Sequence, residues 1–142
     1  MIYFNNKPQL ALTSSSLRNW LKALASDFKV SISTLQYNFV DENTLLQMNQ
    51  KYLQHDTHTD IITFSYGSPV VVEAEIYISI DRMLENATIN KQTTENEFLR
   101  LISHGFLHCV GFNDHTDEEK ANMREQENRC IEMFHVKQRK HV

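Results

Sequence analysis

The stretch EAEIYISI, residues 73–80, alternates between two kinds of side chain along its whole length. Successive side chains of a β-strand point to opposite faces, so this period of two predicts a strand with one buried face. A chain with such a strand must build a sheet and cover one face of it with other elements. The apolar positions are Ala74, Ile76, Ile78 and Ile80.

Further strands are indicated by β-branched and aromatic composition, and helices by apolar residues at helical spacing behind capping residues. The other predicted strands cover residues 3–4, 33–40 and 57–67. The predicted helices begin behind residues 13–16, Asp41, Asp81, Thr94 and Thr116. The last two starts have capping-box spacing, with Glu97 and Glu119 three residues on. We therefore expect one domain over residues 1–142, an α+β fold with a small mixed β-sheet of about four strands packed with about five helices.

Composition limits the functional classes. The net charge of −4 argues against a protein that coats nucleic acid, although a local basic groove remains compatible with it. The N-terminus lacks a basic start followed by an apolar run, and no stretch reaches the roughly 20 apolar residues of a membrane span. Two cysteines are too few for a disulfide framework. We expect a cytoplasmic protein without a membrane partner.

The segment HGFLHCVGFNDH, residues 104–115, has the spacing of a metal site on a late helix and its following loop. His104 and His108 stand four residues apart, so their imidazoles lie one helical turn apart on one face and can reach one zinc ion. Two histidines at this spacing also occur by chance on solvated helices. The residues that follow them are what favour a metal.

Beyond the second histidine, Gly111 is placed to turn the chain at the end of the helix. The loop then returns Asp114 and His115 towards the helix as candidate third ligands, and three protein ligands with one open position are typical of a catalytic zinc ion. Gly105 stands where a helical zinc peptidase carries its Glu base, which argues against that class. A helical glycine costs about 1 kcal/mol relative to alanine, so its presence indicates a close backbone approach.

These residues resemble the signature of the YbeY family of bacterial endoribonucleases and rRNA maturation factors, His-Gly-x-Leu-His-Leu-x-Gly-Tyr-Asp-His. Residues 48–66 and 74–87 are similar to two further segments of that family. The resemblance implies an α+β fold, one bound zinc ion and metal-dependent cleavage of single-stranded RNA. It also implies roles in maturing the end of small-subunit rRNA and in ribosome quality control, with the small ribosomal subunit as a partner. The matching positions are His104, Gly105, Leu107, His108, Gly111, Asp114 and His115, and upstream Asn49, Tyr52, Thr59, Asp60 and Phe64.

The third ligand is where the sequence first departs from the family pattern. Asn113 lengthens the loop by one residue, so Asp114 stands at the family's ligand distance and His115 follows one position later. Both remain candidate metal ligands, because zinc accepts carboxylate oxygen as well as imidazole nitrogen. Since a loop absorbs one extra residue at little energetic cost, we favour His115 as the ligand, with Asp114 beside it.

The second departure is Leu53, which replaces an arginine that faces the substrate cleft in the family. His55 and Arg100 are the candidate catalytic residues, which would supply a proton or a cation instead. The alternative for His55, which we favour, is an exposed loop histidine, and the alternative for Arg100 is a solvated charge on the helix. We expect a zinc-dependent endoribonuclease. The alternatives are another zinc hydrolase on the same scaffold, or a ribosome-associated binding protein with a structural metal, which Leu53 keeps open.

Overall fold

A computed structural model describes residues 1–53 and 59–140 of the chain. Within these residues four strands and five helices are present, and the predicted α+β class is confirmed. The elements are, in chain order, β1 (Ile2–Asn5), α1 (Ser14–Asp27), β2 (Ser31–Val40), α2 (Glu42–Leu53), β3 (Ile61–Ser65), β4 (Val71–Ser79), α3 (Ile80–Ile89), α4 (Thr94–Cys109) and α5 (Asp117–Lys140).

The strands form one mixed sheet in the order β1-β2-β4-β3. β1, β2 and β4 run parallel, whereas β3 pairs antiparallel with β4 and forms an edge. Ile76, at the centre of β4, lies opposite Tyr37 of β2 on one side and Thr63 of β3 on the other. The alternating strand predicted from the sequence is therefore an inner strand of the sheet.

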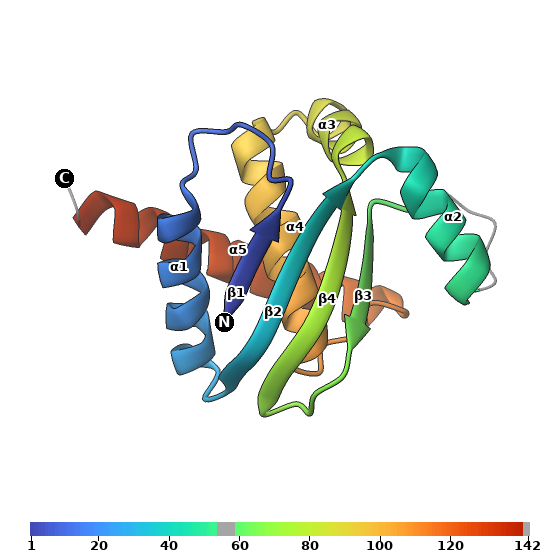
Figure 1. Cartoon of the computed structure of the whole chain (residues 1–142). Helices are drawn as coiled ribbons and strands as arrows, with labels where there is room; N and C mark the ends of the chain where they lie inside the picture. Colours follow the sequence, from blue (N-terminus) through green and yellow to red (C-terminus); the bar gives the residue numbers. More distant parts are fainter. Residues whose placement is uncertain (54–58, 141–142) are drawn as a thin grey trace.

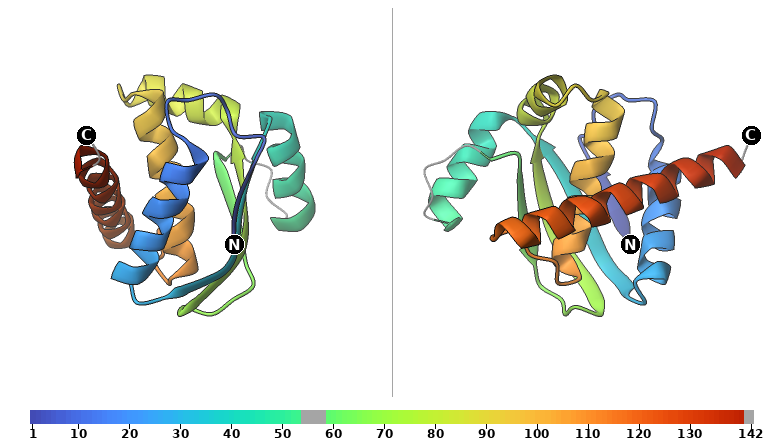
Figure 2. Two further views of the ribbon diagram at one scale, coloured as in Figure 1. Left: turned by 60° about the vertical axis from the view of Figure 1, so that its left-hand side comes forward. Right: turned by 180° about the vertical axis from the view of Figure 1, so that it is seen from behind.

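Helices cover the two faces of the sheet unequally (Figures 1 and 2). α1 and α4 lie against one face, α5 crosses outside α4 as a further layer, and α2 lies on the opposite face. The apolar side of β4 joins the core beneath α4, where the rings of Phe39 and Phe98 stack with centroids 5.4 Å apart. Tyr37 is fully buried and donates its hydroxyl to the carbonyl of Ile102 at 2.9 Å, which ties α4 to the sheet.

Gly105 brings the middle of α4 close to the sheet, as its presence in a helix predicted. A Cβ atom at this position would lie 2.7 Å from Cδ1 of Ile76 and 3.4 Å from Cδ1 of Ile61. Cβ atoms essentially never approach other heavy atoms to 2.7 Å, so any larger residue here would require Ile76 or the helix to shift. The contact sets α4 beside the edge strand β3, with the neighbouring His104 near the start of that strand.

The start of α4 corrects one prediction. Thr93, and not Thr94, is the N-cap, and its hydroxyl accepts the backbone N–H of Asn96 at 3.0 Å. Either threonine has the side chain of a cap. Glu97 consequently has no capping role. It is only 4% exposed, and its Oε2 atom has no hydrogen-bond partner among the described residues.

The other two late helices differ in how well their starts were predicted. α3 begins at Ile80, one residue earlier than expected, because the Ser79 hydroxyl caps it by accepting the backbone N–H of Arg82 at 3.1 Å. The capping box before α5 is confirmed in both directions. Thr116 accepts the backbone N–H of Glu119 at 3.0 Å, and the Glu119 carboxylate accepts that of Thr116 at 2.9 Å.

No helix in the described part of the chain combines the length and the apolar character needed to cross a bilayer.

Candidate metal centre

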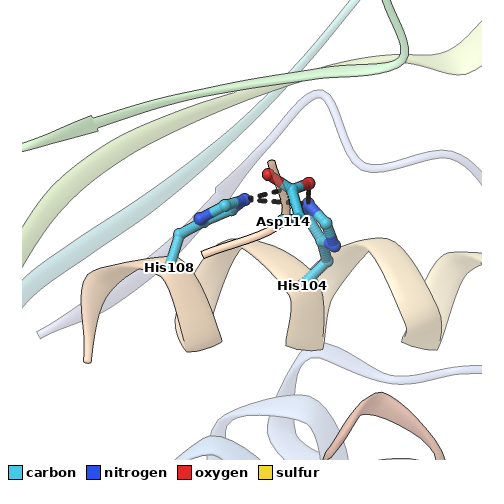
Figure 3. A group of neighbouring side chains, drawn as sticks. All are labelled: His104, His108 and Asp114. Carbon is cyan, nitrogen blue, oxygen red and sulfur yellow. Dashed lines mark hydrogen bonds and ion pairs between the residues drawn. The ribbon is translucent and has the colours of Figure 1, made fainter. Parts of the chain in front are cut away.

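The end of α4 and the loop after it bring two imidazoles and a carboxylate together (Figure 3). The rings of His104 and His108 lie one turn apart, with centroids separated by 4.6 Å. The helix stops at Cys109, and Gly111 follows with a φ of +108°, a backbone conformation that glycine adopts without strain. The loop then folds back, and Asp114 reaches the space between the two rings.

The three donor groups have the separations of metal ligands. Oδ2 of Asp114 lies 3.3 Å from Nε2 of His104 and 3.5 Å from Nε2 of His108, and the two Nε2 atoms are 3.0 Å apart. Ligands arranged tetrahedrally around zinc at about 2.0–2.2 Å stand about 3.3–3.6 Å from one another. Two of the three separations lie in this range, and the 3.0 Å between the two imidazole nitrogens is slightly shorter, so the cluster suits one ion with three protein ligands and a fourth position for water. Nitrogen and oxygen donors of this kind are those that zinc takes at catalytic sites.

A carboxylate from α5 contacts His104 through Nδ1, the ring nitrogen that does not face the cluster. Oε2 of Glu127 lies 2.6 Å from Nδ1 of His104, and its other oxygen accepts Nη1 of Arg100 at 3.0 Å. The second terminal nitrogen of Arg100 donates to Oδ1 of Asn128 at 2.9 Å. Arg100 lines the same cavity as His104, but its guanidinium is engaged with α5.

The two histidines differ in their protonation behaviour. Burial lowers the pKa of His104, but the hydrogen bond and charge of Glu127 outweigh it and hold that pKa above its usual value. Burial, followed by the adjacent charge of His104, lowers the pKa of His108. The pKa values of the two rings therefore shift in opposite directions, as expected for two imidazoles in contact.

Two cavities border the cluster. One, of about 370 Å³, runs along α4 between α3 and α5, and exposed Lys120 and Arg124 line it together with His104. The other, of about 560 Å³, opens along β3 and is lined by both histidines and by His115. Asp60 lines both cavities, and burial raises the pKa of its carboxyl even though the charge of His104 opposes the shift.

The predicted site residues fall into three groups. His104, His108 and Asp114 form the cluster, whereas His115 lines the neighbouring cavity and is not one of the three grouped donors. His55 lies outside the described residues. Glu127 was not anticipated, because it follows His104 by 23 residues and reaches it only through the crossing of α5 over α4. The signal in the sequence that would have found it is its spacing: Glu127 falls between Met123 and Cys130 on the apolar side of the last helix, where the structure buries it.

An α+β domain that gathers a His-His-Asp cluster at the mouth of two polar cavities has the features of a metal-dependent hydrolase. A sequence model of the family described as endoribonuclease YbeY matches residues 3–135. A relative from Flavobacterium psychrophilum named endoribonuclease YbeY is 39% identical over 139 residues, which are 97% of this chain and 99% of the relative. A relative of the same name from Cytophaga hutchinsonii is 39% identical over 136 residues, 94% of each chain. The chain belongs to the YbeY family.

A solved structure shows the same fold. The solution structure of a protein from Thermotoga maritima matches with a TM-score of 0.65 at 26% identity, over 99% of this chain and 93% of that chain. The family, the fold and the class of enzyme predicted from the histidine motif are thereby confirmed.

Proposed function

We propose that this chain is a zinc-dependent endoribonuclease that cleaves single-stranded RNA in the cytoplasm and matures the end of small-subunit rRNA. The observation that supports the proposal most strongly is the cluster of two imidazole nitrogens and one carboxylate oxygen in a member of an endoribonuclease family. Association with the small ribosomal subunit and a role in ribosome quality control belong to the same proposal.

His104, His108 and Asp114 would hold the ion through Nε2, Nε2 and a carboxylate oxygen. We assign the third position to Asp114 because its oxygen lies within 3.5 Å of both histidines, and this assignment replaces the preference for His115 that the family motif suggested. A zinc ion bound here would polarise the scissile phosphate and lower the pKa of a bound water. His115, on the wall of the adjoining cavity, is then free to contact RNA.

The RNA backbone needs cations near the cluster, and the chain carries a net charge of −4. Lys120 and Arg124 lie on the first turns of α5, are exposed, and line the cavity that His104 borders. We assign phosphate binding to these two residues. They would supply from α5 the positive charge that the family arginine supplies at the position of Leu53, whereas Arg100 is held by Glu127.

Asp60 is the group that we assign to take the proton from the attacking water. It lines both cavities at the cluster, and its Oδ2 atom accepts Nδ2 of Asn86 at 3.0 Å, which fixes the orientation of the carboxyl. Burial raises the pKa of Asp60 towards the range in which a carboxylate is an effective general base.

The test is cleavage of a labelled single-stranded RNA by the zinc-loaded protein, before and after treatment with a chelator, with circular dichroism to confirm that the fold persists. We expect cleavage to stop on chelation and to return with added zinc. His108→Ala should lose both zinc and cleavage, while His135→Ala, on the exposed side of α5, should keep both. RNA binding without cleavage in the zinc-loaded wild type would indicate a binding protein with a structural metal. Cleavage that survives chelation would exclude a metal mechanism.

A further inference from the structure

We propose that Glu127 is a positioning residue that fixes the ring of His104 with Nε2 directed at the metal, and that Arg100 holds Glu127 in place for this task. The proposal rests on the metal site assigned above. It concerns how strongly that site binds its ion and why α5 crosses α4 at this point.

The geometry leaves His104 one orientation. Its Nδ1 atom lies 2.6 Å from Oε2 of Glu127, and a carboxylate can only accept in such a contact, so Nδ1 carries the proton. The lone pair of the neutral ring is then on Nε2, the atom that lies 3.0 Å from Nε2 of His108 and 3.3 Å from Asp114. A carboxylate on the far nitrogen also makes the ring a stronger donor to a metal.

Glu127 is itself held rigidly. It is 5% exposed, and its second oxygen accepts Nη1 of Arg100 at 3.0 Å. Because an unpaired buried carboxylate is costly, it matters that both oxygens of Glu127 have partners, one in Arg100 and one in His104. Asn128 accepts the other terminal nitrogen of Arg100 at 2.9 Å, so the guanidinium is fixed at two points on α5.

The two histidine ligands are therefore supported differently. His108 and Asp114 lie on α4 and in the loop directly after it, so the contact between them forms with that local turn. His104 also has a charged partner on another helix, Glu127 of α5. The partner of His104 forms only when α5 has docked, which makes full metal affinity depend on the α4–α5 contact.

The experiment measures the zinc affinity of the purified protein by competition with a chromophoric chelator, together with the visible absorption spectrum of the Co²⁺-loaded form. Glu127→Ala should weaken zinc binding by about 10–100-fold, the usual effect of removing such a partner. Glu127→Gln, whose carbonyl can still accept from Nδ1, should lose less. Both variants should alter the Co²⁺ spectrum, because the donor strength of His104 changes.

Arg100→Gln separates positioning from packing, since it breaks the same ion pair and leaves Glu127 in contact with His104. We expect it to lose less zinc affinity than Glu127→Ala, even where unfolding experiments show equal destabilisation. Glu125→Ala, at an exposed position of α5, should match the wild type. The role of Glu127 is overturned if Glu127→Ala binds zinc within twofold of the wild type, and the role of Arg100 is overturned if Arg100→Gln does. A wild type that binds no zinc would remove the proposed metal site itself.

Discussion

Replacing Gly105 with alanine sets two known effects against each other at the point where α4 meets the sheet. The new methyl group would lie 2.7 Å from Cδ1 and 3.3 Å from Cγ2 of Ile76, and 3.4 Å from Cδ1 of Ile61. Cδ1 is the movable end of the isoleucine, but Ile76 is fully buried, so a new position for this atom has to fit among packed neighbours. Cγ2 is attached directly to the branched carbon, so it moves only if χ1 turns or the strand shifts.

The sizes of the two effects decide whether Gly105→Ala raises or lowers the free energy of unfolding. Alanine gains about 1 kcal/mol over glycine in a helix interior. Forcing an extra methyl group into a packed core costs about 1–3 kcal/mol. We therefore expect Gly105→Ala to change the free energy of unfolding by about 0–2 kcal/mol in the destabilising direction, and to push His104 away from Asp114 as α4 shifts.

The assay is a urea-denaturation cycle on the wild type, Gly105→Ala, Ile76→Val and the double variant. Ile76→Val removes the Cδ1 atom that the alanine would meet. Alone it should cost about 0.5–1.5 kcal/mol, but in the alanine background it should cost less, with a coupling of at least about 0.5 kcal/mol. An alanine variant about 1 kcal/mol more stable than the wild type, without coupling to Ile76→Val, would refute the argument that close approach requires the glycine.

Three further variants test the other groups around the site. Asp60→Asn should slow RNA cleavage by about 10²–10⁴-fold at unchanged zinc content, and a rate within threefold of the wild type would exclude Asp60 as the base. Burial raises the pKa of Glu97 in the folded state, so its contribution to stability falls as pH rises from the unfolded pKa through the folded one. In thermal melts, the stability of Glu97→Gln relative to the wild type should therefore increase as the pH rises from 4 to 7. A difference in stability that does not change with pH would contradict the raised pKa of Glu97. Replacing Lys120 and Arg124 with glutamine should reduce the salt dependence of RNA binding by about 0.7 in the log–log slope per contact, whereas Lys22→Gln on α1 should leave it unchanged.

The parts of the fold that could be predicted from the sequence are those set by contacts between residues close together in the chain. The alternation around Ile76 specified a half-buried strand, and the pair Thr116 and Glu119 marked the start of α5, because each pattern reports a contact within a few residues. The capping-box spacing of Thr94 and Glu97 predicted the wrong cap of α4, because the neighbouring Thr93 can accept the same kind of hydrogen bond and does so in the structure.

The candidate site was also predictable only where contacts within a few residues determine it. Helical spacing places His104 and His108 on one face, and Gly111 turns the chain after them. The spacing left both Asp114 and His115 as candidates for the third position, because the path of the loop depends on how it packs. The contact between His104 and Glu127 depends on the docking of α5 across α4, which no local pattern contains.

Anomalous diffraction at the zinc absorption edge, from crystals grown with stoichiometric zinc, tests the metal site most directly. We predict one peak at about 2.0–2.2 Å from Nε2 of His104, Nε2 of His108 and a carboxylate oxygen of Asp114, with a fourth position left for water or phosphate. A peak that uses His115 in place of Asp114 would contradict the ligand assignment. The absence of any peak at the two histidines would contradict the metal site.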